Sequence, residues 1–276
     1  MGTLPPFPGV PDRRSVNRSI PPSASPLLGL LLSQRIAIVA ALAGVVVLCW
    51  LYLFDQATRM AAMDQDMVMP AKGAADLVLL LVMWWIMMIG MMLPSAAPMI
   101  LTFAAINLGR RVRGQPYTPT VLFTSGYLLA WGSFSVVATL AQWALEQASL
   151  LSPMAMKSTS PLLGGMLFVA AGIYQVTPLK SACLSSCRSP FDFVVNHWRD
   201  GAGGALRMGF SHGLYCLGCC WILMALLFAV GAMNLIWVAA LAVVVLVEKL
   251  FPGGVWIARI GGLLLIAWGV RLVIVN

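Results

Sequence analysis

Charged residues are scarce in this sequence. They make up 9 % of its 276 residues, whereas hydrophobic residues make up 61 %. A soluble domain carries roughly 25 % charged residues, so the scarcity excludes a soluble globular protein. The formal net charge of +8 would favour a nucleic-acid partner in a soluble chain. Because the basic residues here lie in short segments between apolar runs, they predict membrane orientation and no nucleic-acid partner.

Several motifs of catalysis and transport are also missing. The sequence has no phosphate-binding loop, no Ser/His/Asp arrangement and no carboxylate pair, so we predict no catalytic residues and do not favour an enzyme. No internal repeat is visible, which argues against an inverted-repeat transporter. No acidic residue is clearly predicted to be buried, so proton-coupled transport has little support.

Long apolar runs are the main feature that is present. A helix needs about 20 apolar residues to cross a bilayer, and seven runs qualify as candidates. They predict an all-α fold, a polytopic transmembrane helix bundle of about seven helices, with six helices and one re-entrant segment as the alternative. Residues 1–35 predict a disordered cytoplasmic tail because they contain little apolar surface, and residues 36–276 form the predicted transmembrane helical domain. The seven runs are about 36–54, 77–108, 119–145, 161–182, 204–231, 234–250 and 255–275.

The basic residues predict the orientation. With the N-terminus inside, thirteen Lys and Arg residues fall on inner segments and four on outer ones, which is the bias expected for cytoplasmic loops. Lys180 and Lys249 are counted among the inner thirteen. The basic residues therefore predict a multi-pass protein with its N-terminus in the cytoplasm and the lipid bilayer as a partner.

Cysteine and histidine residues cluster in the second half of the chain. On a helix, His212, Cys216 and Cys219 fall within about 60° of one another, and Cys220 widens this stripe to about 100°. Cys183 and Cys187 form a C-x3-C pair one loop away. Thiolate and imidazole suit Cu(I) or Zn(II). The alternatives are plain packing, because free Cys behaves as a small hydrophobe, and a thiol–disulfide relay. Cys49 stands alone and is interpreted as a core residue.

Methionines accompany this cluster. Met87, Met88, Met91 and Met92 lie in the second apolar run, before Pro94. Packing would explain them alone, but the first outer segment repeats the pattern with Met60, Met63, Met67 and Met69, beside Asp64 and Asp66. Thioethers outside and in the membrane, followed by thiols further in, predict a Cu(I) site whose ligand strength rises inward.

Three blocks of sequence resemble a known family. The first is Trp84-Trp85-x-Met87-Met88-x-x-Met91-Met92-Leu93-Pro94-Ser95, and the second is Tyr174-Gln175-x-Thr177-Pro178-Leu179-Lys180-x-x-Cys183-Leu184-x-x-Cys187-Arg188. The third is Gly209-x-x-x-Gly213-x-x-Cys216-x-Gly218-Cys219-Cys220-Trp221. Together they are similar to the bacterial predicted metal-binding integral membrane protein family, a membrane domain of unknown function. The resemblance implies a bacterial inner-membrane protein with a metal site, and supplies no substrate.

The sequence therefore favours an integral membrane metal-binding protein that binds Cu(I) and transfers or delivers it inward, with Zn as the alternative metal. Two other hypotheses stay open: a structural or assembly subunit of a larger membrane complex, and a membrane thiol oxidoreductase. The predicted metal ligands are Cys183, Cys187, His212, Cys216, Cys219, Cys220, Met87, Met88, Met91 and Met92.

Overall fold

The computed structural model describes residues 24–62, 73–152 and 156–275. The part of the predicted tail before residue 24, and the outer motif of Met63, Met67 and Met69 with its two aspartates, lie outside the described residues. The elements are α1 (Ala24–Ala62), α2 (Ala74–Val112), α3 (Thr120–Gln147), β1 (Leu151–Ser152), β2 (Lys157–Ser158), α4 (Pro161–Gln175), α5 (Pro178–Arg188), α6 (Pro190–Asn196), α7 (Gly201–Ala225), α8 (Leu227–Val230), α9 (Leu235–Leu250) and α10 (Gly254–Val275).

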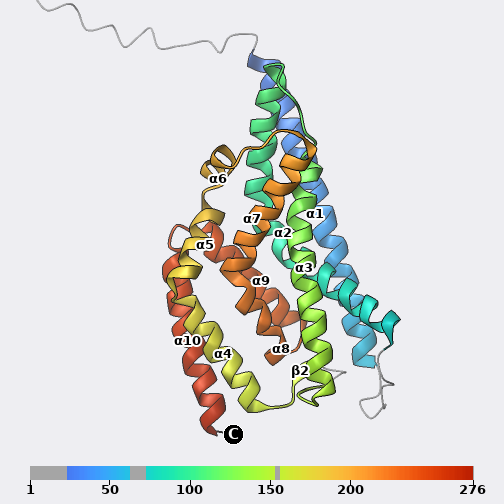
Figure 1. The fold of residues 1–276 in the computed structure, drawn as a ribbon, viewed down its shortest axis with the longest axis vertical. Coiled ribbons are helices and arrows are strands. Elements are labelled where there is room, and N and C mark those ends of the chain that lie inside the picture. The colour runs from blue at the N-terminus through green and yellow to red at the C-terminus, as the bar shows by residue number, and fades with distance from the viewer. Residues whose placement is uncertain (1–23, 63–72, 153–155, 276) are drawn as a thin grey trace, which may run out of the picture.

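The fold is an all-α bundle apart from one short antiparallel β-hairpin, β1–β2, in the described chain. Figure 1 shows α7 and α9 running through its middle, with α4 and α10 side by side at one flank and α1 at the other. The most extensive helix pairings are α3 with α7, α4 with α10, α1 with α2, and α2 with α3. The all-α prediction is therefore confirmed.

The expected number of spanning helices is corrected by the structure. Among the described residues, five helices are long and apolar enough to cross a membrane, namely α1, α2, α3, α7 with α8, and α10, or six if α4 and α5 form one bent span. This judgement rests on length and composition only. The run at 234–250 becomes α9, which has 16 residues and is shorter than the ~20 that a bilayer requires. The estimate of about seven was therefore too high.

Proline explains where the helices bend or end. Thr177 caps α5 and Pro178 occupies its first turn, so the helix restarts in a new direction and α4 and α5 meet at 64°. Pro94 and Pro98 lie inside α2, and Figure 1 shows that α2 changes direction near its middle. The hydroxyl of Ser95, next to Pro94, donates to the Met92 carbonyl at 2.8 Å.

Glycines allow α3 and α7 to approach closely. A methyl group added at Gly209 of α7 would collide with the Phe123 carbonyl of α3, and one at Gly126 of α3 would collide with the Leu206 carbonyl of α7. Small residues at a crossing let helix backbones pack directly against each other. This contact fixes the face of α7 that carries the cysteines toward the interior.

Candidate metal centre

The thiols of α7 gather inside the bundle. Cys216, Cys219 and Cys220 are all buried, so the stripe predicted from helical periodicity faces the interior. The Cys219 and Cys220 thiols donate to the Cys216 carbonyl at 3.0 Å and 3.1 Å. These are local helical bonds that leave the sulfur lone pairs free to meet other partners.

Helix α5 adds a thiol to this group from a second element. The Cys187 side chain lies close to that of Cys219, which also neighbours the side chains of Cys216 and Cys220. The bend at Pro178 makes this possible, because it turns α5 across α7 instead of letting it continue along α4. Cys187 therefore joins the group of four thiols, which we call the thiol cluster: Cys187, Cys216, Cys219 and Cys220.

Cys183 lies next to the thiol cluster on the same helix. Its sulfur sits over the backbone of α7, so close to Gly218 that a methyl group there would be 2.8 Å from it. Both Cys183 and Cys187 are partly exposed, whereas the three α7 thiols are buried. The two α5 cysteines are therefore less enclosed by the described chain than the three thiols of α7.

A thioether reaches the thiol cluster from α2. The Cys220 sulfur contacts the Met92 sulfur at 3.9 Å. Met87, Met88 and Met91 are also buried in α2, where they belong to the hydrophobic core. Of the four predicted methionines, the structure thus brings Met92 to the thiols and places the other three among packed side chains.

His212 lies one helical turn from Cys216 in a pocket of aromatic rings. It is buried, and it stacks on Tyr127 and Phe123 of α3 and faces Phe193 of α6, with ring centroids 5.6, 6.3 and 5.4 Å away. Its Nδ1 atom has no hydrogen-bond partner among the described residues. A buried ring nitrogen without a partner is costly, and it is available to a ligand.

Three polar residues at the thiol cluster were not predicted from the sequence. Lys249 of α9 donates to the Cys216 sulfur at 2.9 Å and to the Ser95 hydroxyl at 3.0 Å. The Tyr127 hydroxyl lies 3.1 Å from the same sulfur and donates to the Met92 carbonyl. Lys249 stands at the end of an apolar run, which made it resemble an interfacial residue. No sequence pattern pointed to Tyr127 or Ser95 in this role.

A buried ion pair lies beside these residues and corrects two sequence expectations. Lys180 and Glu248 are 1 % and 2 % exposed and their charged groups are 2.6 Å apart. Gln175 bonds to both, donating to Glu248 at 2.8 Å and accepting from Lys180. An acidic residue is therefore buried in the bundle, contrary to expectation. Lys180 and Lys249, assigned to inner surface segments, are interior because the bend at Pro178 and the position of α9 carry them inward.

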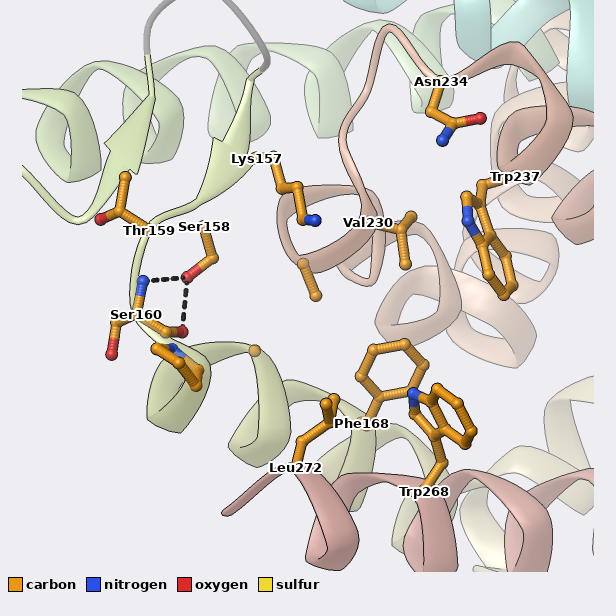
Figure 2. Close-up of a pocket in the computed structure, with 13 residues that line it drawn as sticks. Lys157, Ser158, Thr159, Ser160, Phe168, Val230, Asn234, Trp237, Trp268 and Leu272 are labelled. Carbon is orange, nitrogen blue, oxygen red and sulfur yellow. Dashed lines mark hydrogen bonds between the residues drawn. The ribbon is translucent and has the colours of Figure 1, made fainter. Parts of the chain in front are cut away.

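A separate cavity of about 380 Å³ lies away from the thiol cluster, between β2, α4, α8, α9 and α10. Figure 2 shows Trp237, Trp268 and Phe168 around it, with Lys157 and Asn234 at its edge. Its described lining contains no Cys, His or Met. It therefore offers no soft-metal ligand and is not part of the candidate centre.

The donor set of the thiol cluster suits a soft monovalent cation. Thiolate and thioether sulfurs select Cu(I), whereas the oxygen ligands preferred by Mg²⁺ and Ca²⁺ are lacking. Within the described residues, no three Cys, His or carboxylate side chains are grouped around a single metal position. The described groups are buried thiols, an adjacent thioether and a neighbouring ammonium.

The comparison with known proteins agrees with this chemistry. No curated protein and no solved structure matches the chain significantly. A family model described as a copper chaperone matches residues 81–272, a region that contains α3 to α9 and every predicted metal ligand. The metal-related part of the sequence resemblance is thereby supported, and copper is the metal that the family names. Because the match covers most of the sequence, the chain belongs to the PpoB2 copper chaperone family.

Proposed function

We propose that this protein binds Cu(I) in the membrane at the thiol cluster and passes it inward to an acceptor. The observation that carries the proposal is the convergence of sulfur atoms from three helices. Cys187 of α5 meets Cys219 of α7, and Met92 of α2 meets Cys220 of α7. Sulfur ligands supplied by separate helices to one region are the arrangement that a soft cation requires.

The direction of transfer follows from the gradient in exposure. The α7 thiols are buried, and the α5 thiols are partly exposed. On the orientation predicted from the basic residues, α5 lies toward the cytoplasmic side, so Cys187 and then Cys183 would receive the ion from the buried thiols. The ligands of this route are Cys183, Cys187, Cys216, Cys219, Cys220 and Met92, with His212 beside them.

His212 supports the same proposal through its unsatisfied nitrogen. Its Nδ1 is buried without a hydrogen-bond partner in the described chain, and neutral imidazole is a good ligand for copper. We therefore include it as an additional ligand, used when the ion moves along α7.

The test is copper binding by the purified full-length protein in detergent under reducing conditions. We expect bound Cu(I) in the wild type and its loss in the triple variant Cys216→Ser, Cys219→Ser, Cys220→Ser. Cys49→Ser is the matched control, because Cys49 is a buried cysteine that packs against Gly90 in the α1–α2 contact. Equal copper in the wild type and the triple variant would refute the proposal. His212→Ala then measures the contribution of the imidazole.

A further inference from the structure

Lys249 is one of three buried charged side chains among the described residues. It is 6 % exposed, and its ammonium is held by Cys216 at 2.9 Å and by Ser95 at 3.0 Å. Both partners are formally neutral groups unless the thiol is ionised. A buried ammonium facing a thiol cluster requires an explanation, because removing a cation from water costs several kcal/mol.

The charge of Lys249 is not cancelled by its neighbour in sequence. The Glu248 carboxylate bonds to Lys180 at 2.6 Å and accepts from Gln175 at 2.8 Å, so its negative charge is paired with Lys180. Among the described residues, the buried ionisable Lys, Arg, Asp and Glu side chains are Lys180, Glu248 and Lys249. The net charge of these three side chains is +1, and the unpaired positive charge is that of Lys249, beside Cys216.

The valence of a thiolate-bound metal ion determines whether the metal complex neutralises the positive charge of Lys249 or leaves it uncompensated. Two thiolates around a monovalent cation carry one negative charge, which the Lys249 ammonium balances. Two thiolates around a divalent cation are neutral, so the ammonium would stay uncompensated in a low-dielectric interior. A divalent ion reaches neutrality here only by recruiting a third anionic ligand, such as another thiolate.

We propose that Lys249 is a specificity-determining residue, which selects a monovalent soft cation over a divalent one by balancing the charge of a two-thiolate complex at Cys216. This inference rests on the proposed metal binding. It adds the valence of the bound ion and identifies Lys249 as the residue that discriminates between valences. Lys249 contacts the sulfur ligand and need not contact the metal.

The experiment compares Ag(I), a redox-stable probe for Cu(I), with Cd(II), in detergent-purified full-length protein titrated against competing chelators. Lys249→Met should weaken Ag(I) binding at least about tenfold, equivalent to ~1.4 kcal/mol, without weakening Cd(II). Lys249→Arg keeps the charge and should retain the wild-type ratio of affinities. Lys249→Gln removes the charge but keeps hydrogen-bonding groups for Ser95 and Cys216, and it decides the matter if the Met variant does not fold.

The outcomes separate the two proposals. An Ag(I)-to-Cd(II) affinity ratio that is the same in wild type, Lys249→Gln and Lys249→Met would overturn the role of Lys249 while leaving metal binding intact. Equal weakening of both metals would also overturn it, because it would indicate a structural role. Absence of Ag(I) binding in the wild type, or binding that survives loss of Cys216, Cys219 and Cys220, would overturn the proposed function itself.

Discussion

The ion pair between Lys180 and Glu248 gives the sharpest prediction for stability. The perturbation is Glu248→Leu, which leaves the Lys180 ammonium buried with Gln175 as its remaining bonding partner among those described. At 2.6 Å and an effective dielectric constant near 20, the direct attraction is roughly 6 kcal/mol. Part of this is offset by desolvation, so we expect Glu248→Leu to reduce the free energy of unfolding by about 3–5 kcal/mol.

The double variant Lys180→Met, Glu248→Leu tests the reasoning behind that figure. It removes both charges together, so no uncompensated ion remains, and replacement of a buried pair by apolar residues is often close to neutral. We therefore expect the double variant to be more stable than either single variant. The two costs would then be strongly non-additive, as expected for residues in contact.

The assay is unfolding in mixed micelles, followed by tryptophan fluorescence, for wild type, both single variants and the double variant. Arg59→Met is the control, because its ion pair with Asp55 is exposed and pairs of that kind contribute only about 0–1 kcal/mol. A cost below ~1 kcal/mol for Glu248→Leu, or a double variant as unstable as the sum of the single variants, would refute the reasoning.

Three further predictions follow from the packing of the thiol cluster. Gly209→Ala should cost about 1–3 kcal/mol of stability, because its methyl group would collide with the Phe123 carbonyl. The control Gly203→Ala, with open space around the residue, should cost nothing. Equal melting temperatures of the two variants would contradict this prediction. Maleimide should label Cys183 and Cys187 faster than the buried thiols, and Ag(I) should slow the labelling of Cys187. Mass spectrometry measures the labelling rate at each cysteine, and equal rates at all of them would contradict the difference in exposure. Met92→Leu should weaken Ag(I) affinity about tenfold, or ~1.4 kcal/mol, through loss of the thioether beside Cys220. The buried Met83→Leu should leave that affinity unchanged, and an equal effect of both would assign Met92 to packing.

The bundle and its apolar character were predictable from the sequence alone, because helical periodicity and long apolar runs are local properties. The stripe of His212, Cys216, Cys219 and Cys220 was predictable for the same reason. Cys49 was correctly interpreted as a core residue, and the structure places it in the α1–α2 contact. The lengths of the spans were less predictable, because a run of apolar residues does not show where proline will redirect the chain.

The sequence determined that sulfur and imidazole side chains share one face of α7, since residue spacing on a helix fixes which face each side chain occupies. It also placed two further thiols at Cys183 and Cys187. Only the tertiary structure decided which sulfurs meet. The bend at Pro178 brings Cys187 to Cys219, and the packing of α2 against α9 and the cysteine face of α7 brings Met92 and Lys249 to the same thiols. Those contacts join residues far apart in the chain, and they depend on how whole helices cross. Helix crossing angles are set by the summed packing of many side chains, which no local pattern of residues encodes.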